Sequence, residues 1–193
     1  MTLLALYRHT RTSWNEAGRL QGRADIPALD SALAKLGRQK IPTPYDAWPW
    51  FTSPLTRTRQ TATALGLEPL PDAALIETHW GDYEGKTLDD LSHLGDFLEN
   101  ESRGLDLQPP NGESPRQVQD RLKPWLRLRA AAGVNCGAMS HKGVIRAILA
   151  LAYDWPMLGK PPVKLDWACL HVFRLEADGL PRPEQMNIPL VPR

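Results

Sequence analysis

Two histidines, more than a hundred residues apart, are the residues in this sequence best placed to do chemistry. His9 lies in the sequence RHT and His141 lies in the sequence SHKG. Each histidine follows a short apolar run that is typical of a buried strand, and a helical pattern follows the second one. If both strands belong to one sheet, the two imidazoles meet at its edge and can contact the same anion. This arrangement points to phosphoryl chemistry through a phosphohistidine.

The elements that must position these histidines can be expected from the hydrophobic pattern. Continuous apolar runs at 3–7 and 134–139 predict buried strands, since parallel strands covered on both faces need not alternate. Further short strands are expected at 50–53, 75–77 and 168–175, and helices at 31–37, 54–65, 87–98, 115–132 and 143–153. Ser114 is expected to cap the fourth of these helices.

Alternating strands and helices predict an α/β layered fold with a mostly parallel central sheet. Such sheets bind ligands in a crevice at the carboxyl ends of their strands, where His9 and His141 would lie. The helix that begins near Gly143 would also point free backbone N–H groups at an anion.

Length and composition indicate one ordinary globular domain. The chain has 193 residues, of which 42% are hydrophobic and 23% charged, and this suits a single core. We expect one domain over residues 1–193, ending in an extended proline-rich tail from about residue 180. The formal net charge of +1 gives no reason to expect a nucleic-acid partner.

Cysteine usage and hydropathy narrow the protein class further. Only two cysteines occur, Cys136 and Cys169, so neither a disulfide framework nor a four-ligand zinc site is suggested. Both are expected to be buried thiols. The first apolar run ends at Arg8 and is too short for a signal peptide, and no apolar run reaches the roughly 20 residues that span a bilayer. A cytoplasmic protein without a membrane partner is the expectation.

Five separated blocks resemble the histidine phosphatase superfamily, which contains the cofactor-dependent phosphoglycerate mutases. They follow the family's order and cover most of the chain. The blocks are YRHTRTSWNEAGRLQGRAD, SPLTRTRQTA, LIETHWGDYEG, PPNGES and MSHKGVIRAIL. The resemblance implies a three-layer αβα sandwich of the phosphoglycerate mutase-like type.

The resemblance also implies roles for the residues that could transfer a phosphoryl group. His9 matches the family's nucleophile, and His141 matches the second histidine, which hydrogen-bonds the transferred group. Glu77 matches the general acid and base, although Glu84 lies close by in sequence and leaves that assignment open. No metal or organic cofactor is implied.

The phosphate-binding residues follow in the same way. Arg8 and Arg57 match the two arginines that clamp the phosphate, a task suited to planar guanidinium groups that keep their charge. Asn15 matches a residue that reaches the phosphate by its side-chain amide, although it could instead cap the following turn.

The sequence departs from the family beside the nucleophile. The residue after the nucleophile is nearly always glycine in the family, and here it is Thr10. A Cβ there would cost roughly 1–2 kcal/mol if that backbone required a positive φ; otherwise the threonine side chain lies beside the phosphate. The next residue is Arg11, which makes the mouth of the site more positive.

The sequence therefore predicts a metal-independent phosphomonoesterase that acts on a small phosphorylated metabolite. The short chain and the proline-rich end favour hydrolysis over isomerisation, because mutases of the family carry longer segments that shield the phosphohistidine. Two alternatives stay open: a catalytically retired member that binds a phosphorylated ligand or a partner, and a true phosphoglycerate mutase. A homodimer also stays open.

Reversing the charge of Arg11 tests whether the substrate carries a second anionic group. We expect Arg11→Glu to lower the preference for bisphosphates over monophosphates by about fivefold, as an exposed charge interaction of ~1 kcal/mol would. The measurement is kcat/KM for matched pairs of esters. An unchanged preference would remove the support that Arg11 gives to this idea.

Overall fold

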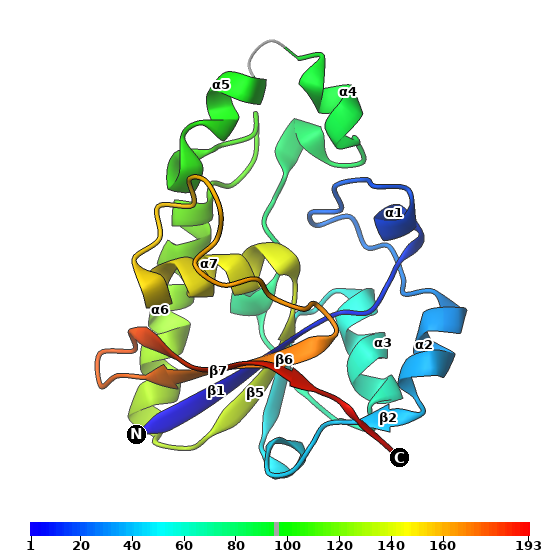
Figure 1. Cartoon of the computed structure of the whole chain (residues 1–193), viewed down its shortest axis with the longest axis vertical. Coiled ribbons are helices and arrows are strands. Elements are labelled where there is room, and N and C mark those ends of the chain that lie inside the picture. The colour runs from blue at the N-terminus through cyan, green and yellow to red at the C-terminus, as the bar shows by residue number, and fades with distance from the viewer. Residues whose placement is uncertain (95–96) are drawn as a thin grey trace.

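A central six-stranded sheet and a separate two-stranded pair make up the strands of the computed structural model, which describes residues 1–94 and 97–193 (Figure 1). In chain order the strands are β1 (Thr2–Arg8), β2 (Gln39–Lys40), β3 (Trp50–Thr52), β4 (Leu70–Pro71), β5 (Cys136–Ser140), β6 (Cys169–Leu175), β7 (Pro181–Pro189) and β8 (Val191–Pro192).

The helices of the described residues are of two kinds. The α-helices are α1 (Ser13–Glu16), α2 (Asp30–Leu36), α3 (Thr56–Ala64), α4 (Leu88–Ser92), α5 (Phe97–Glu101), α6 (Pro115–Ala132) and α7 (Lys142–Tyr153). Short 3-10 turns are η1 (Tyr45–Ala47), η2 (Ala73–Leu75), η3 (Gly81–Tyr83) and η4 (Gly104–Asp106).

The main sheet has the order β4-β3-β5-β1-β6-β7. The first four strands run parallel to one another, and β6 and β7 add an antiparallel edge. The expected α/β fold with a mostly parallel sheet is therefore confirmed. Because β1 and β5 are parallel neighbours in the register Arg8 to Ser140, the two residues that follow them emerge side by side.

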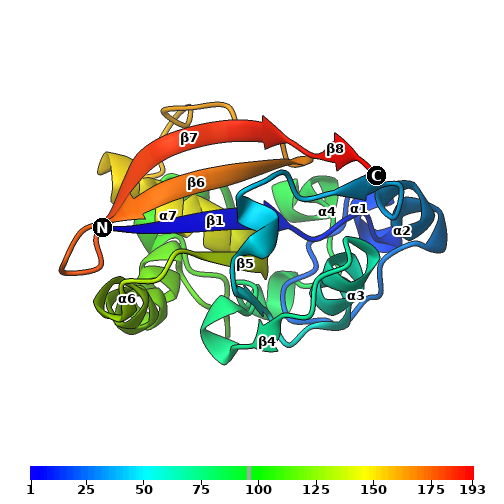
Figure 2. The ribbon, with the colours of Figure 1, turned by 90° about the horizontal axis from the view of Figure 1, so that it is seen from below.

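Helices cover both faces of this sheet and give three layers (Figure 2). On one face Leu4 and Leu6 of β1 pack in a core with residues of α6 and α7. On the other face Ala5 and Tyr7 pack in a second core with residues of α2 and α3. Successive β1 side chains thus enter opposite cores, as a strand buried on both faces requires.

The long helix α6 begins where the sequence predicts. Ser114 accepts a hydrogen bond from the Gln117 backbone, the Gln117 side chain accepts one from the Ser114 backbone, and Pro115 occupies the first turn. This capping box satisfies N–H groups that the helix leaves free. The helix ends at Gly133, which has a φ of 67°.

The helix expected over residues 87–98 is shorter in the structure. Thr87 caps α4, which ends at Ser92, and α5 begins at Phe97. Residues 95–96 of the expected range lie outside the described residues. Figure 1 shows α4 and α5 at the end of the molecule opposite the N-terminus.

The prediction of a short strand over residues 75–77 is wrong. Leu75 ends the turn η2, and the chain that follows is extended but pairs with no strand of the described residues. Its carbonyl groups instead accept hydrogen bonds from side chains: Leu75 O accepts from Ser140 Oγ at 2.8 Å, and Ile76 O accepts from Arg121 at 2.6 Å. When side chains satisfy the backbone of a short apolar segment, its sequence looks the same as that of a strand, and the pattern cannot distinguish the two.

The proline-rich tail expected from about residue 180 is a strand of the main sheet. Residues 181–189 form β7 and pair with β6, and β8 pairs with β2. Prolines are tolerated because β7 lies at the edge of the sheet, where the backbone N–H groups on the outer side form no hydrogen bonds to a neighbouring strand. Ile188 and Leu190 are buried in the second core.

Two further expectations can be compared with the structure. Cys136 and Cys169 are both free and buried, as predicted. Among the helices of the described residues, none is long and apolar enough to cross a membrane.

Truncation of Ile188 tests whether the C-terminal segment belongs to the core. We expect Ile188→Ala to lower the free energy of unfolding by about 2–4 kcal/mol, because it removes a buried side chain. Gln185→Ala, at an exposed position of the same strand, serves as the control and should change it little. Urea denaturation measures both, and equal stability of the two variants would contradict the buried edge strand.

Candidate active site

His9 lies directly after β1 and is almost fully buried, with 4% of its surface exposed. Its Nδ1 lies 2.7 Å from the carbonyl oxygen of Thr10. A carbonyl only accepts hydrogen bonds, so this contact assigns the proton to Nδ1 and leaves the lone pair on Nε2. Nε2 is then the atom that can attack phosphorus.

His141 lies directly after β5 and packs beside His9. The two ring centroids are 5.2 Å apart, with planes tilted by 57°. His141 Nε2 lies 2.8 Å from Ser53 Oγ, and its Nδ1 is buried without a hydrogen-bond partner in the described structure. When the Ser53 hydroxyl donates to Nε2, the proton resides on Nδ1, which can then donate to a phosphoryl oxygen.

Burial and nearby cations keep both imidazoles neutral. The pKa of His9 is well below its ordinary value, mainly because of desolvation and then because of the Arg8 and Arg57 charges. Desolvation also lowers the pKa of His141, followed by the Arg57 charge. A neutral His9 retains the lone pair that a nucleophile needs.

Arg8 and Arg57 place two guanidinium groups against this pair. Arg57 is fully buried, and it donates to Gly22 O and Ala24 O at 2.8 Å each. The Nε atoms of both arginines are buried and have no partner among the described residues. Phosphate oxygens are suitable acceptors for such N–H groups, so the geometry agrees with a phosphate clamp.

Glu77 reaches the same region from the loop after η2. Its carboxylate accepts hydrogen bonds from Thr78 N at 2.8 Å and from Gly143 N at 3.3 Å. The first turn of α7 thus binds this carboxylate, whereas the sequence led us to expect a substrate anion there. A Cβ on Gly143 would collide with Glu77 and Thr78, so glycine permits the close approach.

Glu84, the rival for the acid role, is already bonded to backbone. Its carboxylate accepts from Arg23 N at 2.8 Å, Ala24 N at 3.1 Å and Trp80 N at 3.3 Å. Since Ala24 O in turn accepts from Arg57, Glu84 supports the loop that holds this arginine. Glu77 also accepts backbone N–H groups, but one of them belongs to Gly143, two residues after His141, so its position favours Glu77 as the candidate acid.

Thr10 fits beside His9 without backbone strain. Its φ is not positive, so a Cβ costs nothing through the left-handed conformation. Its N–H donates to Thr61 Oγ1 at 3.0 Å and its carbonyl contacts His9 Nδ1. Thr10 thereby fixes the ring of His9 through its backbone.

Asn15 does not cap the following turn, the alternative that the sequence left open, but lies within α1 and completes a capping box with Thr12 before it. Its Oδ1 accepts from Thr12 N at 3.1 Å, and its own N–H donates to Thr12 Oγ1 at 3.2 Å. Asn15 also lines the pocket that contains His9. Its Oδ1 is used by Thr12, which leaves the amide Nδ2 as the group that could contact a ligand. Contact with phosphate stays a prediction for this residue.

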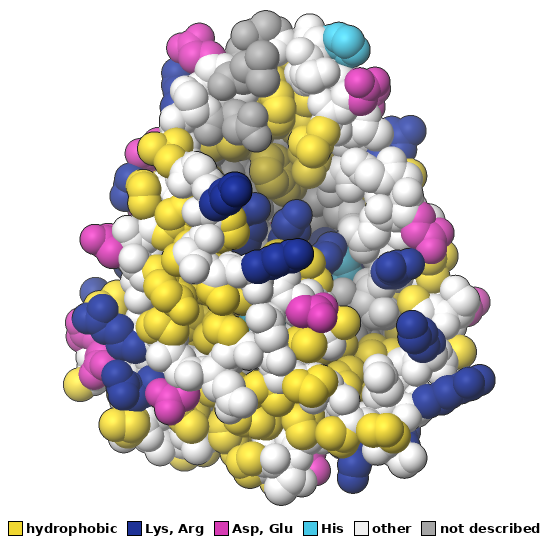
Figure 3. All heavy atoms as spheres, viewed as in Figure 1, with side chains coloured by type: hydrophobic (Ala, Val, Ile, Leu, Met, Phe, Trp, Pro, Cys, Tyr) yellow, Lys and Arg dark blue, Asp and Glu magenta, His cyan; other side chains and the backbone are white. Residues whose placement is uncertain are grey.

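A pocket of about 1010 Å³ is lined by Arg8, His9 and Thr10, whereas Arg57, Glu77 and His141 are not among its lining residues. Its walls include exposed side chains, so it is open to solvent. Lys and Arg side chains gather around the hollowed centre of the face shown in Figure 3. The charged residues that line the pocket are the basic Arg8, Arg11, Lys35 and Lys164 and the acidic Glu16 and Asp166.

Residues outside the family blocks also contribute to this site. Trp167 lines the pocket, and its ring lies 5.6 Å from Arg8 Cζ and 5.8 Å from Lys142 Nζ. No pattern in the sequence pointed to Trp167, because only the fold brings the segment before β6 to the end of β1. Among the described residues, no group of three or more His, Cys, Asp or Glu side chains could hold a metal ion.

Buried neutral histidines should make the fold sensitive to acid. The pKa values of His9 and His141 lie well below 6.5, and burial lowers the pKa of His171 to about 4. Below about pH 6.5 the unfolded chain binds protons that the folded chain does not, so the free energy of unfolding falls as pH falls. Each such histidine contributes a slope of up to about 1.4 kcal/mol per pH unit.

Urea denaturation between about pH 7 and about pH 5 measures this slope. His171→Asn should make it shallower, whereas His93→Asn, at an exposed position, should leave it unchanged. A wild-type slope of zero in this range would contradict the prediction.

Comparison with known proteins identifies the family of the chain. The chain matches the family model of the histidine phosphatase superfamily (branch 1) over residues 4–189. It is 28% identical over 192 residues to the 2,3-bisphosphoglycerate-dependent phosphoglycerate mutase of Methylobacterium radiotolerans, covering 91% of each chain. It is also 29% identical over 161 residues to the proposed phosphoserine phosphatase 2 of Hydrogenobacter thermophilus, covering 78% of each.

Solved structures show the same fold. The crystal structure of TTHB049 from Thermus thermophilus superposes with a TM-score of 0.73 at 27% identity, covering 97% of this chain and 99% of that one. With the family model matching almost the whole chain, this protein belongs to the histidine phosphatase superfamily.

Proposed function

We propose that this protein is a phosphomonoesterase that transfers a phosphoryl group to His9 and then to water. One observation carries the proposal: among the described residues, His9 Nε2 is free of hydrogen-bond partners, the Nε groups of Arg8 and Arg57 are buried and unpaired, and His9 and Arg8 line a pocket that opens to solvent. Positioning and charge stabilisation of this kind are the main requirements of phosphoryl transfer.

The first step forms a bond from Nε2 to phosphorus and breaks the ester P–O bond. The carboxyl group of Glu77 gives its proton to the departing alcohol oxygen. Arg8, Arg57 and His141 bind the equatorial oxygens, on which negative charge is spread in the transition state.

In the second step a water oxygen attacks the phosphorus of the phosphohistidine. Glu77, now a carboxylate, takes a proton from this water while the P–N bond breaks. Inorganic phosphate leaves, and both His9 and Glu77 return to their starting protonation states. No other reactant is needed for the balance.

Water access supports hydrolysis over isomerisation. The pocket beside His9 opens to solvent, so water can reach a phosphohistidine. Chain length and the C-terminal segment do not add to this argument: a named mutase aligns with 91% of this chain and has 91% of its own length covered, and the segment is a strand of the sheet. Phosphoglycerate mutase activity is therefore the second candidate.

Thr10 gives little support to a retired, ligand-binding protein. The threonine adopts no positive φ and holds His9 through its backbone carbonyl. Thr10 lines the pocket, and we expect its hydroxyl to donate to a phosphate oxygen. Activity is therefore compatible with this departure from the family.

The pocket supports a small metabolite with a second anionic group as the substrate. Its volume of about 1010 Å³ suits a small molecule, since such sites commonly measure about 300–1,000 Å³. Arg11, Lys35 and Lys164 line it beyond the residues next to His9. They would meet a carboxylate or second phosphate at the far end of the substrate.

Trapping of the phosphoenzyme tests this proposal. A panel of phosphate esters labelled at phosphorus is incubated with the protein without added metal, and the reaction is quenched in alkali, where phosphohistidine survives. We expect label on His9 and steady release of phosphate, both lost in His9→Asn. Glu77→Gln should slow release from alkyl esters by about 10²–10⁴-fold, the usual contribution of general acid–base catalysis.

Other outcomes favour the alternatives. Label on His9 with transfer to a second phosphoglycerate hydroxyl, and little release, would identify a mutase. Ester binding without label on His9, in protein shown to be folded, would overturn the enzymatic proposal.

A further inference from the structure

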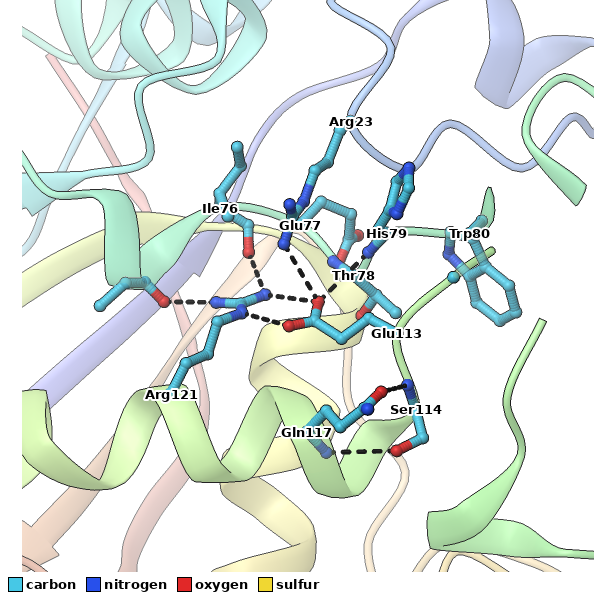
Figure 4. A network of polar contacts seen from close by, with 12 residues as sticks. Arg23, Ile76, Glu77, Thr78, His79, Trp80, Glu113, Ser114, Gln117 and Arg121 are labelled. Atoms are coloured by element: carbon cyan, nitrogen blue, oxygen red, sulfur yellow. Dashed lines mark hydrogen bonds and ion pairs between the residues drawn. The ribbon is translucent and has the colours of Figure 1, made fainter. Parts of the chain in front are cut away.

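The loop that carries Glu77 is held in place by the side chain of Arg121. From α6, Arg121 donates to Ala74 O at 2.5 Å through Nη1 and to Ile76 O at 2.6 Å through Nη2 (Figure 4). Because this loop lacks strand partners among the described residues, these bonds take the place of a sheet ladder. The second one acts on the peptide group that joins Ile76 to Glu77.

Glu113 fixes the guanidinium group of Arg121. Its Oε1 lies 2.8 Å from Arg121 Nε, and its Oε2 lies 3.3 Å from Nη2. The side chain of Arg121 is only 20% exposed and that of Glu113 only 13%. Such a two-point contact orients the planar fork more strictly than a single charge contact does.

Glu113 also binds the chain on the other side of Glu77. Its Oε2 accepts from His79 N at 3.3 Å, and its own N–H donates to His79 O at 2.7 Å. Arg23 Nη2 adds a contact to Oε2 at 3.4 Å. Figure 4 shows this carboxylate between the Arg121 fork and the backbone that follows Glu77.

We propose that Arg121 and Glu113 are positioning residues that hold the Glu77 carboxyl at the distance from His9 that proton transfer requires. This inference rests on the proposed function. The pair fixes the backbone on both sides of Glu77, and neither residue is assigned a chemical step. A small displacement of a general acid can lower the rate strongly without loss of substrate binding.

The leaving group of the substrate separates this role from a merely structural one. An alkyl phosphate needs a proton from Glu77 when its poor leaving group departs, whereas p-nitrophenyl phosphate releases a stable phenolate without that proton. The measured quantity is the single-turnover rate of His9 phosphorylation by glycerol phosphate and by p-nitrophenyl phosphate.

Arg121→Lys keeps the positive charge and removes the fork. We expect phosphorylation by glycerol phosphate to slow by about 10- to 100-fold, and phosphorylation by p-nitrophenyl phosphate to slow by less than about threefold. Glu113→Gln should shift the two rates in the same direction by a smaller factor. The matched control is Arg116→Lys, on the same helix, whose exposed ion pair with Asp106 does not touch the loop; both rates should stay within about twofold.

The results that would overturn the inference are distinct from failure of the proposed function. Equal slowing with both esters, or no slowing with either, in folded Arg121→Lys and Glu113→Gln would exclude a positioning role. Unfolding of both variants, followed by circular dichroism, would show that the pair supports the fold rather than Glu77. Absence of phosphohistidine in the wild-type protein would instead overturn the phosphatase proposal itself.

Discussion

Positive charge buried beside two neutral imidazoles is the interaction on which this site depends. Arg57 has no exposed surface, and the charges of Arg8 and Arg57 help to lower the pKa of His9. Buried cations are costly unless they are paired and hydrogen-bonded. Carbonyl groups and nearby carboxylates compensate the charge here in part, and the remaining N–H groups suit a phosphoryl group. In the proposed function, the same burial that favours binding of an anion also keeps His9 unprotonated.

Irregular backbone, rather than strand or helix, carries much of this arrangement. Two carboxylates organise it: Glu84 binds the loop whose carbonyl groups hold Arg57, and Glu113 orients Arg121 against the loop that carries Glu77. Buried backbone polar groups need partners, and side chains supply them where no neighbouring strand can. The precision of the site therefore depends on polar contacts outside the reacting groups.

Relatives with phosphatase and mutase names share this scaffold, since both are similar to the chain at comparable identity. Formation of a phosphohistidine would be common to both activities, and the fate of that intermediate would separate them. A pocket that is wide, basic and open to solvent beside His9 is the feature of this chain that bears on that choice. The same pocket would also help to select the substrate, because its basic residues extend beyond those next to His9.

The sequence by itself determined the layered fold, the strands that present His9 and His141, and the capped start of α6, because apolar runs and caps are local signals. It could not separate Glu77 from Glu84, since only tertiary hydrogen bonds show that Glu77 binds the start of the helix after His141 and that Glu84 binds the loop at Arg23. It also mistook the residues before Glu77 for a strand and the edge strand β7 for a tail. In both cases the partners of the backbone decide the structure, and these partners lie far away in the chain.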